Sequence, residues 1–172
     1  MAGLDPAIHP SIEAASAFRD VRYAAMPGTP ARGLKQEIDL MAIEQTLSTT
    51  SPYIRSIVRI AVALLFLEHG LSRLFGWPSP LPTPPALTLY WFAGAIELFG
   101  GLLFGLGLFT RPAAFLMSGE MAAAYFLSHA PRGFFPILNG GDAAILYCFI
   151  FLYIAFAGAG PWSLDAIWRK KA

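Results

Sequence analysis

The stretch LTLYWFAGAIELFGGLLFGLGLF, residues 87–109, decides the fold class of this chain. A helix of this length crosses about 30 Å of hydrocarbon, since each residue adds about 1.5 Å along the axis. Glu97 is its only charged side chain and lies near its centre. The stretch therefore predicts a membrane-spanning helix that carries one buried acid.

Three further apolar segments, residues 53–74, 112–130 and 143–159, are long enough, or nearly so, to cross the same thickness. A proline-rich loop at 78–85 separates the first two predicted helices, because proline breaks helices. Thr110-Arg111-Pro112 makes a tight turn with proline at the start of the next helix. The pattern predicts an all-α integral membrane protein, a four-helix bundle over residues 53–165.

The composition agrees with a membrane protein. Hydrophobic residues make up 56% of the 172 residues and charged residues 13%, against about 45–50% and a quarter in soluble domains. A water-soluble enzyme is thereby excluded, and a net charge of +1 argues against a nucleic-acid partner. Cys148 is the only cysteine, which excludes a disulfide framework and a cysteine-built zinc site.

The two ends of the chain are polar. Residues 1–40 hold nine of the 23 charged residues and lack the apolar core of a signal peptide, so we expect a disordered leader. An alternative is that this leader is translated upstream sequence and that the natural protein begins at Met41. Residues 41–52 then form a short cytoplasmic lead-in, and residues 166–172 a basic cytoplasmic tail.

The distribution of basic residues predicts the topology, because Lys and Arg accumulate on the cytoplasmic side. Seven lie on one side of the predicted bundle and two on the other. The seven are Lys35, Arg55, Arg59, Arg111, Arg169, Lys170 and Lys171, and the two are Arg73 and Arg132. We therefore expect a multi-pass protein of the bacterial inner membrane with both termini in the cytoplasm.

The second predicted helix carries a glycine face. Gly94, Gly101 and Gly105 share this face with Glu97, and small residues let a neighbouring helix approach closely. Glu97 should therefore point at another helix. No basic residue is expected at its depth, so desolvation should keep the acid neutral. Its role is either a packing hydrogen bond or a proton relay.

Ionisable residues also gather toward the outer membrane surface, where they often mark a function. Glu68, His69 and Arg73 lie in the outer half of the first helix, and Asp142 begins the fourth. We expect these four side chains to form a polar pocket there. The plainer alternatives are that Arg73 extends to the headgroups and that His69 is a structural histidine. No metal-ligand spacing is present.

The motifs together resemble the DoxX family. Phe66-Leu-Glu-His69-Gly70-Leu-Ser-Arg73-Leu-Phe75-Gly76-Trp77 is similar to its first-helix signature. Glu97-Leu-Phe-Gly100-Gly101 and Asn139-Gly140-Gly141-Asp142 resemble later motifs of the family. Arg73 stands where the family usually has lysine, and the family's acid after Asn-Gly-Gly usually comes one or two residues later than Asp142. The resemblance implies a four-helix inner-membrane protein related to the membrane subunit of thiosulfate:quinone oxidoreductase.

Two functions remain open, and with them whether the protein is an enzyme. The first is a quinone-linked redox or respiratory accessory subunit that works with a soluble redox partner. Glu68, His69 and Glu97 would then handle protons, while Arg73, Asn139, Asp142 and Glu120 bind the substrate. The second is a non-catalytic membrane scaffold or small-solute carrier. A homo-oligomer is compatible with either function.

Overall fold

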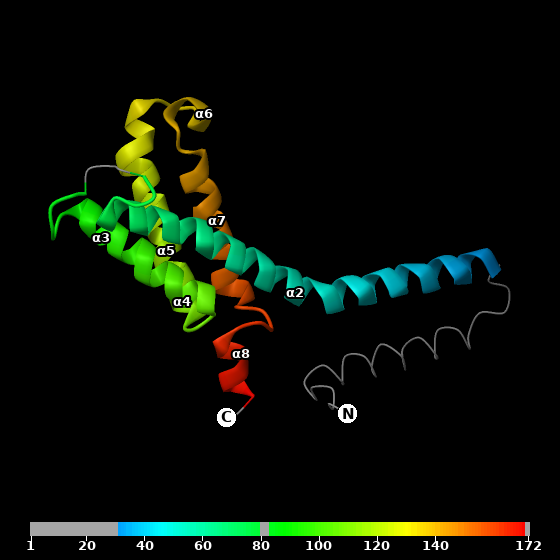
Figure 1. Ribbon diagram of the computed structural model, residues 1–172. Helices are drawn as coiled ribbons and strands as arrows, with labels where there is room; N and C mark the ends of the chain where they lie inside the picture. The colour runs from blue at the N-terminus through cyan, green and yellow to red at the C-terminus, as the bar shows by residue number, and fades with distance from the viewer. Residues whose placement is uncertain (1–30, 80–82, 171–172) are drawn as a thin grey trace. The chain divides into compact units, whose positions relative to one another are not determined.

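A computed structural model of the chain describes residues 31–79 and 83–170, and every regular element in these ranges is helical (Figure 1). The all-α prediction is confirmed for this part of the chain. The α-helices are α2 (Ala31–Phe75), α3 (Leu89–Ala95), α4 (Gly101–Leu106), α5 (Thr110–Ala124), α6 (Pro136–Asn139), α7 (Asp142–Ala157) and α8 (Leu164–Arg169). Two π-helical turns, η1 (Ile96–Gly100) and η2 (Tyr125–His129), and one 3-10 turn, η3 (Ala130–Arg132), complete the set.

The chain divides into two units after Leu47. The described part of the first unit is the beginning of α2, which is already helical at Ala31 and continues through Pro52. We expected the first helix to begin near residue 53, and the structure has it begin at Ala31. Residues 34–47 contain neither glycine nor proline and are mostly good helix formers, which explains the earlier start. The expected leader and the alternative start concern residues that lie largely outside the described ranges.

The second unit, residues 48–172, holds the core. Helices α5 and α7 lie side by side, and α3, η1 and α4 form one continuous helical rod from Leu89 to Leu106 (Figure 1). Phe66, Phe104 and Phe151 are fully buried, with the ring centroids of Phe66 and Phe151 4.7 Å apart. Met117 and Ile154 complete the centre of this cluster.

The predicted packing glycines of the rod lie against α2. A Cβ atom at Gly94 would lie 3.0 Å from Leu74, and one at Gly101 would lie 3.2 Å from Leu67. At Gly105 the nearest neighbour is Ala63, again at 3.2 Å. The absence of side chains at these three positions is therefore what lets the rod and α2 approach closely.

Arginines of α2 bind the carbonyl groups at the ends of later helices. Arg59 is fully buried and donates to the carbonyl oxygens of Phe104 and Gly105 at the end of α4. It also donates to those of Ala159 and Trp162 in the loop after α7. The carbonyl groups of the last helical turn lack partners within the helix, so a buried guanidinium both satisfies them and complements their negative dipole.

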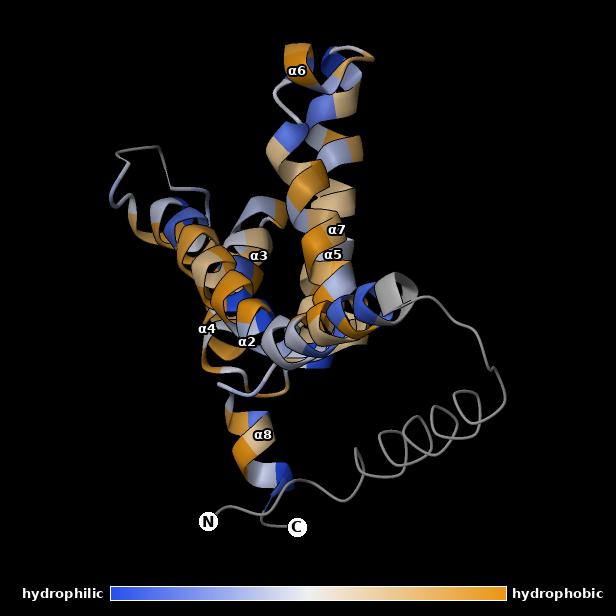
Figure 2. Ribbon diagram, turned by 90° about the vertical axis from the view of Figure 1, so that its right-hand side faces the viewer, coloured by the Kyte–Doolittle hydropathy of each residue, from blue (hydrophilic) through white to orange (hydrophobic). Residues whose placement is uncertain are grey.

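Large apolar side chains are exposed on each long element of the second unit. Figure 2 shows how hydrophobic residues are distributed along these helices. Examples are Leu64 of α2, Phe99 of η1, Phe115 of α5 and Phe149 of α7, all of them exposed. In the described ranges one helix, Leu89–Leu106, is both long and apolar enough to cross a membrane, and α7 is a shorter apolar helix. We expected four such helices. The second half of α2 carries arginines and an acid, and α5 with the π turn η2 contains the polar residues Arg111, Glu120 and His129.

Candidate functional site

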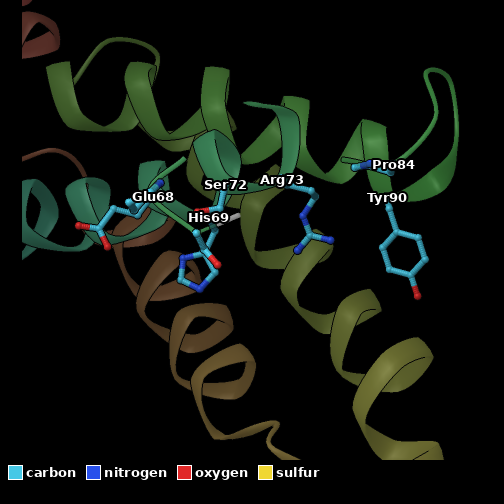
Figure 3. A pocket seen from close by; sticks show the side chains of 8 residues that line it. Glu68, His69, Ser72, Arg73, Pro84 and Tyr90 are labelled. Carbon is cyan, nitrogen blue, oxygen red and sulfur yellow. The ribbon is translucent and has the colours of Figure 1, made fainter. Parts of the chain in front are cut away.

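A pocket of about 590 Å3 lies where α2 ends and the proline-rich loop leads to α3 (Figure 3). Its described lining comes from the last turns of α2, from the loop and from the first turn of α3. The lining residues are Glu68, His69, Ser72, Arg73, Pro78, Ser79, Pro84 and Tyr90. The structure thus brings together three of the four side chains that the sequence predicted for a polar pocket.

Arg73 and Glu97 form a bidentate ion pair inside the protein. Nε of Arg73 donates to Oε2 of Glu97 and Nη2 donates to Oε1, both at 3.0 Å. Glu97 is 1% exposed, whereas the Arg73 side chain is 31% exposed and faces the pocket with its remaining surface. Two parallel charge-assisted bonds fix the guanidinium in both position and plane.

This pair corrects our expectation that Glu97 has no basic neighbour at its depth. Side chains of a helix tilt toward its N-terminus. Arg73 stands near the C-terminal end of α2, so its long side chain extends back along the helix, away from the end of α2. There its guanidinium meets the carboxylate of Glu97. The depth of a Cα atom therefore misjudges the depth of an arginine's charge.

Glu97 belongs to the π-helical turn η1, and Gly70 of α2 packs against that turn. A Cβ atom at Gly70 would lie 2.6 Å from the backbone nitrogen of Leu98 and 3.1 Å from the carbonyl carbon of Glu97. Single π turns are rare within α-helices and are frequent at functional sites. Neither the π turn nor the packing of Gly70 against it was predicted from the sequence. Gly70, next to Glu68 and His69, was a signal, while nothing in the sequence indicated the π turn.

His69 and Tyr90 complete the polar lining. Nδ1 of His69 lies 2.9 Å from the carbonyl oxygen of Leu65, one turn earlier in α2. The guanidinium carbon of Arg73 lies 5.9 Å from the centre of the Tyr90 ring, within the range of a cation–π contact. Tyr90 was not predicted from the sequence, because the loop of residues 76–88 between α2 and α3 is long enough to place the first turn of α3 in many positions.

The structure places the other predicted site residues away from this pocket. Asp142 is exposed in the first turn of α7 and does not line the pocket. Our expectation that it joins Glu68, His69 and Arg73 there is therefore wrong. Asn139 is buried in a turn, where Nδ2 donates to the Gly133 carbonyl and Oδ1 accepts from the Gly141 amide. Its amide is fully used in folding this loop.

Glu120 points inward from α5, as the sequence predicted, but it does not line the pocket. Both of its carboxyl oxygens are buried, and neither has a hydrogen-bond partner among the described residues. The carboxyl interacts electrostatically with Glu97 and Arg73. Glu120 therefore belongs to the surroundings of the ion pair rather than to the pocket wall.

The arrangement offers hydrogen bonding, proton transfer and aromatic contact. Arg73 is a fixed cation, Glu68 is an exposed carboxyl, and His69 and Tyr90 bring groups that can donate or accept. Within the described ranges no three His, Cys, Asp or Glu side chains are grouped as a metal site requires.

Comparison with known proteins places these features in a family. The family described as DoxX matches residues 54–130, which include α2 from Ile54 on, the pocket and all of α5. An uncharacterized protein of Haemophilus influenzae is 45% identical over 129 residues, which cover 70% of this chain and 94% of that protein. An uncharacterized membrane protein of Mycobacterium tuberculosis is 27% identical over 67% of this chain and 81% of its own length. No solved structure matches.

Proposed function

This chain belongs to the DoxX family of membrane proteins, and from that premise we propose that it binds a quinone headgroup in the pocket beside Arg73. In this proposal the protein is a quinone-linked redox or respiratory accessory subunit of the bacterial inner membrane. The observation that carries it is the fixed guanidinium of Arg73. Glu97 holds this guanidinium through two hydrogen bonds, and the exposed part of Arg73 lines the pocket.

The proposal includes a multi-pass topology with four crossing segments and both termini in the cytoplasm. The outward apolar side chains on α2, η1, α5 and α7 support it, because such residues suit contact with lipid. An alkaline phosphatase fusion near Thr83 should be active, and one after the C-terminal residue should be inactive. The reverse activities would contradict this topology.

The chemistry of a quinone headgroup fits the lining residues. Its carbonyl oxygens accept hydrogen bonds, and Arg73 retains donors on Nη1, which makes no hydrogen bond within the described part of the chain. Tyr90 offers an aromatic face, and Glu68 is an acid–base group at the pocket wall. Glu97 positions the guanidinium in this proposal. Electrons would come from a soluble redox partner.

Titration of the full chain in lipid nanodiscs with decylubiquinone tests the proposal. The double variant Arg73→Met/Glu97→Leu removes the guanidinium without leaving a buried carboxylate unpaired. It should bind the quinone at least about tenfold more weakly than the wild type, by the energy of a hydrogen bond to a charged group. Arg132→Met is the matched control, because Arg132 is exposed in η3 and does not line the pocket. Equal binding by the double variant, or none by the wild type, would contradict the proposal.

A structural role is the second candidate, and the same ion pair favours it. The pair connects α2 to the rod that contains η1, and a buried bidentate contact between two helices is what a scaffold needs. Lower stability of the single variants Arg73→Met and Glu97→Leu, together with no quinone binding by the wild type, would support this second function.

A further inference from the structure

We propose that the pocket selects the reduced form of its ligand, an aromatic diol or quinol, over the corresponding quinone. The reason is that His69 presents a hydrogen-bond acceptor to the pocket. This inference rests on the quinone site proposed above and specifies which form of the ligand the site holds.

The hydrogen bond of His69 determines its tautomer. Nδ1 lies 2.9 Å from the carbonyl oxygen of Leu65, and a carbonyl oxygen can only accept. Nδ1 therefore carries the hydrogen atom and donates it. In the neutral ring the other nitrogen, Nε2, then has a free lone pair and acts as an acceptor. The ring is also held by Tyr147, whose centroid lies 5.9 Å away in an edge-to-face arrangement.

The other polar groups of the pocket add acceptors more than donors. Glu68, when ionised, accepts only. The Ser72 hydroxyl donates to the Trp77 carbonyl at 3.4 Å, which leaves its oxygen as an acceptor. Arg73 is the one side chain of the described lining that only donates, and Glu97 takes its Nε hydrogen and one of its two Nη2 hydrogens. The hydroxyls of Ser79 and Tyr90 can donate or accept and so favour neither form of the ligand. A ligand that brings its own hydroxyl donors therefore satisfies more of this pocket than one that brings carbonyls alone.

A quinone and its quinol differ in this respect. The two ring oxygens of a quinone only accept, so one of them would place a lone pair against that of His69 Nε2. A quinol hydroxyl donates to Nε2, and its second oxygen can accept from Arg73 Nη1. His69 and Arg73 are four residues apart in α2, about 6 Å along its axis, so both side chains lie on the face of the helix that lines the pocket. A tenfold preference would raise the midpoint potential of the bound pair by about 30 mV.

Anaerobic titration of the full chain in lipid nanodiscs with duroquinol and with duroquinone tests this inference. The wild type should bind duroquinol at least tenfold more tightly. In His69→Phe the two affinities should differ by less than twofold, while His129→Phe should keep the preference, since His129 does not line the pocket. Nitrogen-15 NMR of the wild type, independent of any variant, should show the neutral His69 ring protonated at Nδ1.

Each alternative outcome has a distinct meaning. Equal binding of the two forms by the wild type would overturn the inference and leave the quinone site standing. A preference that persists in His69→Phe, or a ring protonated at Nε2, would overturn the role of His69. Failure of both ligands to bind would overturn the proposed function and this inference together.

Discussion

The guanidinium of Arg73 and the carboxylate of Glu97 meet through two hydrogen bonds of 3.0 Å, and they connect the end of α2 to a π-helical turn. One member of the pair is almost fully buried and the other opens onto the pocket. The same contact thereby holds two helices together and presents a fixed cation to whatever occupies the pocket. The stability of the fold and the proposed ligand binding therefore involve the same two side chains.

We predict that Glu97→Gln destabilises the protein by about 3–5 kcal/mol, because it leaves the guanidinium of a buried pair without its counter-charge. Arg73→Met should lower the free energy of unfolding by a similar amount. The double variant Arg73→Met/Glu97→Leu should be more stable than either single variant, since no charge is then left alone. Thermal unfolding in mild detergent measures all three, and additive single effects would show that the two side chains are not coupled.

Gly70 should tolerate no side chain. In Gly70→Ala the new Cβ atom would meet the backbone of Leu98 at 2.6 Å, so α2 and η1 must separate at a cost of about 1–3 kcal/mol. Gly119→Ala is the matched control, because a Cβ atom there has no neighbour within 4 Å. Alanine at that helical position should stabilise by about 0.5–1 kcal/mol. The thermal midpoints of the two variants should therefore move in opposite directions.

Asp165 should make stability depend on pH. Burial raises the pKa of its carboxyl, but hydrogen bonds from the backbone amides of Thr110 and Phe109, and the charge of Arg169, outweigh burial and lower the pKa below the ordinary value. A group with a lowered pKa in the folded state stabilises above its unfolded pKa, about 4, and that stability is lost as the pH falls through the folded value.

The corresponding variant is Asp165→Asn. It should lower the free energy of unfolding by about 1 kcal/mol at pH 7, as for the loss of a helix cap. The difference between variant and wild type should shrink as the pH falls below about 4. Urea unfolding of both proteins across pH 3–7 measures this, and a difference that stays constant over the range would contradict the role of the carboxylate.

We expect the Glu120 side chain to lower the stability of the folded protein. Both carboxyl oxygens are buried without a hydrogen-bond partner in the described part of the chain, and unsatisfied buried polar groups cost about 1–3 kcal/mol. Glu120→Met fills the same space with apolar atoms and should raise the thermal midpoint. The matched change Glu44→Met, at an exposed position of α2, should leave it unchanged. A lower midpoint in Glu120→Met would show that this carboxyl stabilises the fold.

The sequence predicted the helical class, the glycine face of the rod and three lining residues of the pocket, because periodicity and helical spacing determine these features locally. It misplaced Asp142, since the direction in which the first turn of α7 faces depends on how α6 and the preceding loop fold. It also did not predict that Arg73 pairs with Glu97, because this contact depends on where the end of the long arginine side chain lies. Tyr90 lines the pocket because the loop between α2 and α3 places the first turn of α3 there, and tertiary contacts determine the path of such a loop.

The residues that accept hydrogen bonds from Arg59 are synthesised long after Arg59 itself. Its guanidinium donates to carbonyl groups that follow about 45 and 100 residues later in the chain. In the multi-pass topology proposed above, Arg59 would reach the membrane before these carbonyl groups are made, and lipid headgroups would be its available partners. The bundle therefore closes around Arg59 only when Ala159 and Trp162 have emerged. A chain that stops before them would lack two of the four carbonyl partners of this buried guanidinium.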